Sequence, residues 1–245
     1  MPEAALRGIA AGAPEGSGVP VLPALRALVP GGVLRPGSVV GLTGLGAASL
    51  GAALAAGATA PEGEDGPGGW CGVVGLPDFG VLAAAGMGAA PERLLLVDEP
   101  GDRWPDVVAA LAEAVGLILL RPPERPGAAA VRRLSALARR HGCVLTLTGA
   151  FADAWPGTRL RLRLEDVAWH GLGAGHGRLR GRLADVVAEG PGPARRVRLW
   201  FPDADGAVTP AETVPALKPV GGPVSVNGPV SAGGPVHTVA GEEIA

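Results

Sequence analysis

A glycine-rich turn between a short apolar segment and an alanine-rich segment constrains this chain more than any other feature. Residues 37–50 read Gly-Ser-Val-Val-Gly-Leu-Thr-Gly-Leu-Gly-Ala-Ala-Ser-Leu. This order predicts a strand, a tight turn through Gly44 and Gly46, and a helix that reaches about residue 56. It is the layout of a phosphate-binding P-loop, whose backbone N–H groups surround a phosphate at a helix N-terminus. The spacing G-x-x-x-x-G-K-[ST] fits with Gly41 and Gly46 as its two glycines.

The residues that carry the chemistry of such a loop are missing. A nucleotide hydrolase needs a lysine on the phosphates, a hydroxyl on Mg²⁺ and an acidic metal partner. Ala47 stands at the lysine position and Ala48 at the hydroxyl position, and the apolar run at 117–120 ends in Arg121, which would repel Mg²⁺. Asp98, after the apolar run at 94–97, is better explained as a polar residue that ends a strand. We therefore expect no ATPase activity, no catalytic residue and no cofactor.

Composition restricts the class of protein further. The two cysteines, Cys71 and Cys143, lie in apolar segments and predict buried, reduced thiols of a cytoplasmic protein. The four histidines show no metal-ligand spacing, so we expect no metal site. Residues 36–61 carry no charge, but they are mostly small and lack flanking aromatic residues. A buried strand, turn and helix explains them better than a membrane span, and residues 1–3 do not resemble an export signal.

Strands that alternate with helices predict an α/β fold, with a mainly parallel central sheet flanked by helices. The expected helices are a turn at 22–28 and the segments 47–56, 79–86, 105–115 and 126–141. The expected strands after the first are 70–75, 93–97, 117–120 and 143–148. Residues 1–19 are expected to form a flexible arm, 20–201 the folded core, and 202–245 a disordered tail rich in Pro and Gly.

Arginines at alternate positions distinguish the segments 158–165, 177–187 and 195–200. The arginines in question are Arg159, Arg161, Arg163, Arg178, Arg180, Arg182, Arg196 and Arg198. Period-two patterning predicts antiparallel strands that extend the sheet. Formal charge is −7 over residues 1–120, +9 over 121–200 and −4 over 201–245, which predicts one electropositive face. That face is either solvated or a contact surface for DNA or an acidic partner.

Residues 20–200 resemble the RecA family core, and within it the ImuA and ImuA-prime accessory proteins of translesion mutagenesis cassettes. The lead-in at 22–40, with Gly31-Gly32-Val33-Leu34-Arg35-Pro36-Gly37, is similar to the RecA approach to its P-loop. In this resemblance Pro77 replaces the catalytic glutamate and Arg121 the Walker B aspartate, while the segment 145–149 lacks the nucleotide-sensing glutamine. With Ala47 and Ala48, four family sites are substituted. The resemblance implies a RecA-like P-loop core that has lost hydrolysis.

Three functions remain as hypotheses. The resemblance implies a non-catalytic adaptor in DNA-damage-induced (SOS) translesion synthesis. Its partners would be a Y-family polymerase-like protein of the ImuB type and an error-prone replicative-type polymerase, in the cytoplasm or at the nucleoid. The second hypothesis is direct binding of single-stranded DNA by the arginine strands, although Trp169 and Trp200 are the only aromatic residues between 158 and 200. The third is an ATPase with an atypical site on the amides of residues 44–48.

Overall fold

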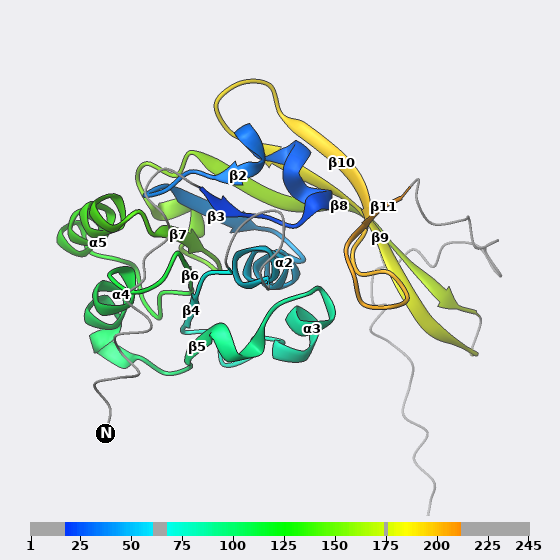
Figure 1. Ribbon diagram of the computed structural model, residues 1–245, viewed down its shortest axis with the longest axis horizontal. Coiled ribbons are helices and arrows are strands. Elements are labelled where there is room, and N and C mark those ends of the chain that lie inside the picture. Colours follow the sequence, from blue (N-terminus) through cyan, green and yellow to red (C-terminus); the bar gives the residue numbers. More distant parts are fainter. Residues whose placement is uncertain (1–17, 61–67, 174–175, 212–245) are drawn as a thin grey trace, which may run out of the picture.

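A nine-stranded sheet dominates the computed structural model, which describes residues 18–60, 68–173 and 176–211 (Figure 1). Its strand order is β11-β10-β9-β8-β3-β7-β6-β4-β5. The strands are β3 (Val39–Thr43), β4 (Cys71–Val74), β5 (Leu94–Val97), β6 (Leu117–Leu120), β7 (Val144–Leu147), β8 (Leu160–Leu172), β9 (Gly177–Glu189), β10 (Arg195–Trp200) and β11 (Thr209–Pro210). The strands from β3 to β8 pair in parallel, and β9, β10 and β11 continue the sheet in antiparallel fashion. The predicted α/β architecture and its antiparallel extension are therefore confirmed.

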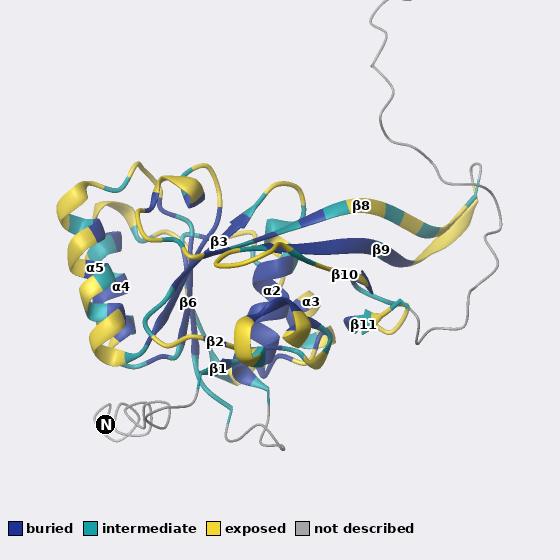
Figure 2. Cartoon of the chain, turned by 90° about the horizontal axis from the view of Figure 1, so that it is seen from above, coloured by how far each residue is buried: buried dark blue, intermediate teal, exposed yellow. Residues whose placement is uncertain are grey.

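Helices cover both faces of the parallel strands (Figures 1 and 2). On one face lie α2 (Ala47–Thr59) and α3 (Val81–Gly86), and on the other lie α4 (Trp104–Ala112) and α5 (Ala128–His141). In β6, Leu117 and Leu119 join the apolar cluster under α2, whereas Ile118 and Leu120 join the cluster under α4 and α5. A strand buried on both sides needs apolar residues at every position, which explains the unbroken Leu-Ile-Leu-Leu run.

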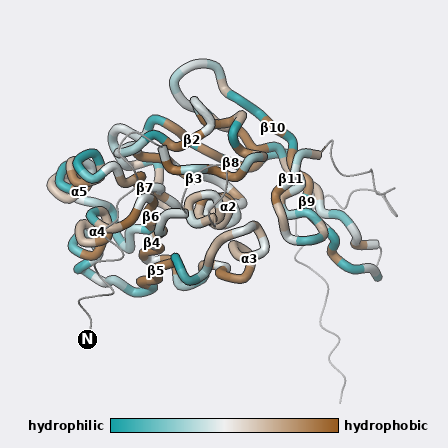
Figure 3. Tube along the Cα trace, in the orientation of Figure 1, coloured by the Kyte–Doolittle hydropathy of each residue, from teal (hydrophilic) through white to brown (hydrophobic). Residues whose placement is uncertain are grey.

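The two long helices differ in how much of their surface they bury. Every residue of α2 from Leu50 to Thr59 is buried. A Cβ on Gly57 would lie 2.6 Å from Val21 Cα, so this approach of α2 to the backbone requires glycine. By contrast, α5 buries one stripe made by Val131, Leu134 and Ala138, while its arginines, Arg132, Arg133, Arg139 and Arg140, are exposed; hydrophilic and hydrophobic residues mix along it in Figure 3. The Ala- and Gly-rich composition of α2 is thus explained by close packing.

A small lobe precedes β3. It contains β1 (Val19–Pro20), the 3₁₀ helices η1 (Pro23–Leu28) and η2 (Pro30–Gly32), and β2 (Val33–Leu34). β1 pairs antiparallel with β2, and η1 packs against β10. The remaining short helices are η3 (Pro91–Arg93), η4 (Gly101–Arg103) and η5 (Ala152–Ala154). The helical turn predicted at 22–28 is confirmed by η1.

Several predicted boundaries shift by a few residues. The helix expected at 79–86 begins at Val81, and the one expected at 105–115 begins at Trp104 and ends at Ala112. The amide of Gly116 donates to the Trp70 carbonyl at 3.2 Å, so this glycine joins the sheet instead of closing the helix. The helix expected at 126–141 begins at Ala128, and Gly142, at φ 72°, ends it as predicted.

The prediction of a disordered tail from residue 202 is wrong for its first ten residues. The Asp203 carboxylate accepts hydrogen bonds from the amides of Asp205 and Ala207 and from the Thr209 hydroxyl. Val208 is buried, and β11 pairs with β10. The ordered chain therefore continues to Ala211. The rest of the predicted tail, at 212–245, and residues 1–17 of the predicted arm lie outside the described residues.

Within the described residues, no helix has both the length and the apolar character that a membrane span requires.

Candidate functional site

The turn after β3 has the backbone geometry that its sequence predicts. Gly44 and Gly46 adopt left-handed conformations, with φ of 71° and 92°, and α2 begins at Ala47. The Leu50 amide donates to the Gly46 carbonyl at 3.0 Å, which closes the first turn of the helix. Gly41 lies within β3, where a Cβ would come 3.3 Å from Thr158 Cγ2. The strand, the glycine turn and the helix N-terminus that the sequence predicts are thus all present.

The side chains at this turn are apolar. Ala47 is half-buried, Ala48 is exposed, and the Leu45 side chain is 89% exposed. Leu164 of β8 packs against the turn so closely that a Cβ on Gly46 would lie 2.4 Å from its Cδ1. Neither a cation nor a hydroxyl is supplied by residues 44–48. The turn offers backbone amides alone to an anion, without the lysine charge that fixes a triphosphate.

Arg121 lies at the same edge of the sheet as the turn, because β3 and β6 are parallel and both end there. Its Nη2 donates to Asp78 Oδ1 at 2.7 Å, and this hydrogen bond lowers the pKa of the Asp78 carboxyl below 3.8. A Cβ on Gly149 would come 3.0 Å from Arg121 Cγ, so the arginine lies across the end of β7. An ion pair thus stands where a metal-binding acid would be needed.

Of the other positions that the sequence singles out, two lie at this edge near Arg121 and one lies far from the turn. Pro77, which follows β4, is exposed, and Thr148, which follows β7, is buried. Both therefore lie at the edge that carries Arg121. Asp98 follows β5, and three strands separate β5 from β3, so this acid is remote from the turn. The interpretation of Asp98 as a polar residue that ends a strand is therefore confirmed.

Acidic side chains neutralise the arginines that point outward from β8 and β10. Arg161 pairs with Asp153 at 3.1 Å, and Arg163 binds Glu165 and Glu189. The following pairs belong to the same network: Arg196 with Glu165, Asp166 and Asp185, and Arg198 with Asp185. Five of the six acids in the basic stretch 121–200 are used in this way. With four arginines and five acids, this surface is an ion-pair network that has no excess positive charge.

The prediction of a single electropositive face is wrong, because strand register divides the arginines between two faces. Residues directly opposite in an antiparallel pair share a face. Arg163 and Arg196 both stand opposite Val187, so they share its face of the sheet. Arg182 stands opposite Trp169 and lies an odd number of positions from Val187 along β9. Arg182 therefore projects from the other side of the sheet, and Arg178 and Arg180 lie beyond it, where the register of β8 and β9 shifts.

Arg182 is not available to contact DNA or a partner at the surface. Its side chain is buried, its Nε donates to the Phe201 carbonyl, and its guanidinium lies over the rings of Trp169 and Phe201, 5.2 and 5.7 Å from their centres. Burial lowers the pKa of this guanidinium. Arg178 and Arg180 are exposed, and no ion pair joins either of them to another described residue.

The outer half of the β8–β9 hairpin projects beyond the helices as an arm, which we define as residues 166–172 and 177–183 (Figures 1 and 2). The arm carries large apolar side chains that are 42–48% exposed. They are Val167, Trp169, Leu172 and Leu179. Sequence reasoning named Trp169 only as an aromatic residue and missed the exposed apolar group, because register shifts after Glu165 and after His170 interrupt the alternation of the two strands.

The two cysteines are buried and free, as the sequence predicts. Burial raises the pKa of the Cys71 thiol to about 12 and raises that of Cys143 as well. In the part of the chain that the structure describes, no cluster of His, Cys, Asp or Glu is arranged to hold a metal ion.

Sequence reasoning also missed Arg35 and Arg195, which lie with Arg159 at the other edge of the sheet, where β3, β8 and β10 begin. Nothing in the sequence connects these three arginines, since each lies in a different segment.

Comparison with known proteins gives this chain a family. It is 37% identical over 138 residues to the uncharacterized protein Rv3395c of Mycobacterium tuberculosis (strain ATCC 25618 / H37Rv). The match covers 55% of this chain and 62% of that protein, so the chain spans less than two thirds of its relative. A family described as MT3502 N-terminal domain matches residues 27–157, which run from η1 to the segment before β8. Because the match covers just over half of its residues, the chain belongs to the MT3502 N-terminal domain family.

Proposed function

We propose that the chain is a non-catalytic accessory protein with a RecA-like P-loop core, which acts in DNA-damage-induced translesion synthesis. In this proposal it bridges a Y-family polymerase-like protein of the ImuB type and an error-prone replicative-type polymerase. The protein acts in the cytoplasm or at the nucleoid, without a cofactor and without hydrolysing a nucleotide.

One observation carries this proposal: the substituted positions all lie at the same edge of the sheet. Ala47 follows β3, Pro77 follows β4, Arg121 follows β6 and Thr148 follows β7. These strands are parallel, so their carboxyl ends meet where an α/β fold binds its ligand. A cluster of substitutions at this one edge, with the sheet and turn intact, supports a scaffold that has lost its chemistry.

The arm supplies a surface suited to a protein partner. Trp169 combines a large apolar area with little conformational entropy, and tryptophan is enriched among residues that dominate interface energies. Leu179 and Val167 extend the apolar area along the same hairpin. We assign the polymerase-like partner to the arm, because an exposed apolar cluster on a projecting element is costly unless another protein covers it.

Co-purification of the full chain with an ImuB-type protein tests the proposal. The wild-type chain should retain the partner, and Trp169→Ala combined with Leu179→Ser should weaken retention at least tenfold. Arg133→Gln is the matched control, since Arg133 is exposed on α5 and pairs only with Asp106. No association of the wild-type chain at any salt concentration would refute the adaptor function. Stoichiometric binding of ATP in calorimetry would instead favour the atypical ATPase.

Binding of single-stranded DNA remains a second candidate, and the arm favours a new location for it. Trp169 stands opposite Arg182, and Arg178 and Arg180 are exposed near it on the same strand, β9. An exposed aromatic ring beside unpaired cations is the combination that binds single strands. Arg161 and Arg163 are unsuited to this role, because they already bind acids.

The anisotropy of a fluorescent oligothymidylate at low salt tests this candidate. Arg178→Gln combined with Arg180→Gln should weaken binding about tenfold and reduce its salt dependence. Arg161→Gln combined with Arg163→Gln removes the same formal charge and should change binding less. Equal losses in the two double variants would indicate unspecific attraction and would exclude the arm as a defined DNA site.

A further inference from the structure

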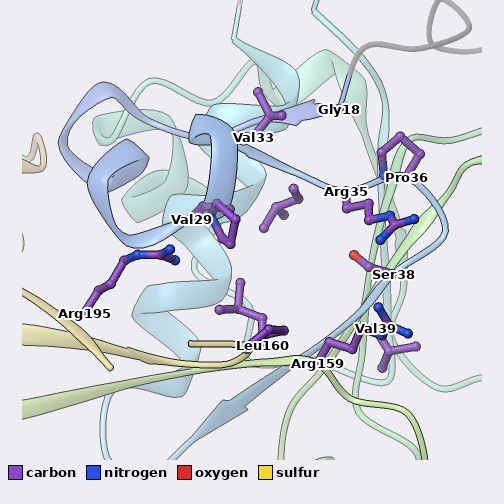
Figure 4. A pocket seen from close by; sticks show the side chains of 13 residues that line it. Gly18, Val29, Val33, Arg35, Pro36, Ser38, Val39, Arg159, Leu160 and Arg195 are labelled. Carbon is purple, nitrogen blue, oxygen red and sulfur yellow. The ribbon is translucent and has the colours of Figure 1, made fainter. Parts of the chain in front are cut away.

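A cavity of about 450 Å³ lies at the edge of the sheet opposite the P-loop turn (Figure 4). It is enclosed by the lobe that contains η1, η2 and β2 and by the first residues of β3, β8 and β10. Ser38 and Val39 line it where β3 begins, whereas the turn follows Thr43 at the other end of this strand. Its volume falls within the range of small-ligand sites.

Three arginines line this cavity. Arg35 comes from the segment between β2 and β3, Arg159 immediately precedes β8, and Arg195 is the first residue of β10. Arg195 Nη1 reaches the Leu28 carbonyl oxygen at 3.5 Å, a distance too long for a strong hydrogen bond. None of the three forms an ion pair with another described residue. Guanidinium groups stay protonated at every physiological pH, so the cavity is permanently cationic.

Among the residues that the structure describes, no acidic side chain lines the cavity. The neighbouring arginines of β8 and β10 differ, because Arg161, Arg163, Arg196 and Arg198 all bind acids. The acids of this part of the chain are therefore concentrated on one surface and absent from the cavity. Three like charges around one space repel each other, so an anion that enters should be held strongly.

The walls between the arginines restrict the kind of anion. Figure 4 shows Arg35 and Arg159 on the side of Ser38, and Arg195 across the cavity, with Val29 and Leu160 between them. The rest of the lining is mainly aliphatic and proline, and it contains no aromatic ring. A nucleotide base would find nothing to stack on. The best complement is a chain with an anionic group at each end of an aliphatic part.

We propose that this cavity binds an acidic peptide segment of a partner protein, in which two carboxylates flank aliphatic side chains. One carboxylate binds Arg35 and Arg159, the other binds Arg195, and the aliphatic side chains pack on Val29, Val33 and Leu160. Arginine suits this role because its planar group binds a carboxylate through two parallel hydrogen bonds. The site does not depend on the proposed function, since neither the arm nor the P-loop turn contributes to it.

Fluorescence anisotropy with the full chain and a labelled Glu-Leu-Val-Glu peptide, blocked at both ends, tests the proposal. The wild-type chain should bind it, and a Gln-Leu-Val-Gln peptide should bind at least tenfold more weakly. Arg159→Gln and Arg195→Gln should each weaken binding about tenfold, because each removes hydrogen bonds to a charged group. Arg133→Gln, which removes an equal charge from α5, should leave binding unchanged.

A second variant separates the cavity from general electrostatic attraction. Val33 is 36% exposed and lines the cavity, so Val33→Phe should fill the space and weaken binding while all three arginines remain. Circular dichroism and a thermal melt would verify that each variant is folded. The proposal is overturned if the full chain does not bind the peptide even at low salt. Equal losses of peptide affinity in Arg133→Gln and Arg159→Gln also overturn it. So does displacement of the peptide by an oligothymidylate that binds with equal affinity.

Discussion

The two edges of the parallel sheet differ in whether their arginines are paired with acids. At the carboxyl edge, the P-loop turn has no cation of its own, and the nearby Arg121 is bound to Asp78 at 2.7 Å. At the amino edge, three arginines line a cavity that no acid of the described residues lines. The first edge has a glycine turn without a cation in it, and the second has cations that form no ion pair with another described residue. The packing of Leu164 against Gly46 accounts for the turn at the first edge, whereas no described acid neutralises the arginines at the second.

Glycine substitutions at the carboxyl edge should have the largest effect on stability. Gly75 has a φ of 74°, and a Cβ there would lie 2.3 Å from the Arg121 carbonyl oxygen. We expect Gly75→Ala to lower the free energy of unfolding by about 3 kcal/mol or more, because backbone strain and a backbone clash combine. Urea denaturation followed by circular dichroism measures this loss.

Gly44→Ala is the matched control for Gly75→Ala. Gly44 has nearly the same φ, 71°, but no atom lies within 4 Å of a Cβ placed there. Its cost should be the left-handed backbone alone, about 1 kcal/mol. Equal losses in the two variants would mean that the carboxyl edge is not held together by close packing around Arg121.

Removal of the charge of Asp185, the buried acid that binds two arginines, should have the next largest effect on stability. Asp185 is buried and accepts hydrogen bonds from Arg196 and Arg198, both at 2.9 Å. Asp185→Asn should lower the free energy of unfolding by about 2 kcal/mol, since two charge-assisted hydrogen bonds weaken. Thermal melts at low and high salt measure this effect.

Arg159→Gln sharpens the comparison, because its effect on stability should have the opposite sign. It removes one of three unpaired cations from the cavity, so stability should stay constant or rise by a few tenths of a kcal/mol. A loss as large as that of Asp185→Asn would show that the cavity arginines are structural, and would remove the contrast between the two edges.

Much of this fold could be predicted from the sequence, because its signals are local. The turn at Gly44 and Gly46, the strand Leu117–Leu120 and the helix end at Gly142 follow from apolar runs and glycine positions. β11 was missed because the segment is rich in Pro and Gly, and its order depends on hydrogen bonds to the Asp203 carboxylate.

The candidate site was less predictable, because it depends on pairing between distant segments. The division of the arginines between two faces follows from the register that places Trp169 opposite Arg182, and no single strand contains this information. Arg35, Arg159 and Arg195 meet only after β3, β8 and β10 are aligned in one sheet. Substitutions such as Ala47 for lysine were visible at once, since a motif fixes their spacing.

Restoring the missing P-loop residues tests whether the turn can still hold a nucleotide. Ala47→Lys combined with Ala48→Thr should increase the affinity for Mg-ATP about tenfold, because a charged hydrogen bond is added to an intact turn. Isothermal titration calorimetry measures the affinities of the wild-type chain and of the double variant. Ser49→Thr is the control, because it changes the same helix without adding a charge. Ala53→Ser is unsuitable as a control, because Ala53 lies in the buried part of α2. Wild-type affinity equal to that of the double variant would contradict the loss of the nucleotide site.

Loss of the ion pair between Arg121 and Asp78 should lower stability only slightly, and that effect should depend on pH. The arginine lowers the pKa of Asp78 below 3.8, so the pair stabilises the fold above that pH and this contribution is lost as pH falls through the lower, folded value. Both groups are partly exposed, so Arg121→Gln should lower the free energy of unfolding at neutral pH by only a few tenths of a kcal/mol. Urea denaturation at neutral pH and in acid measures the difference, which should shrink in acid as the Asp78 carboxyl becomes protonated. If it persists there, Arg121 stabilises the carboxyl edge through its packing against Gly149, and the charge at this edge has no role in stability.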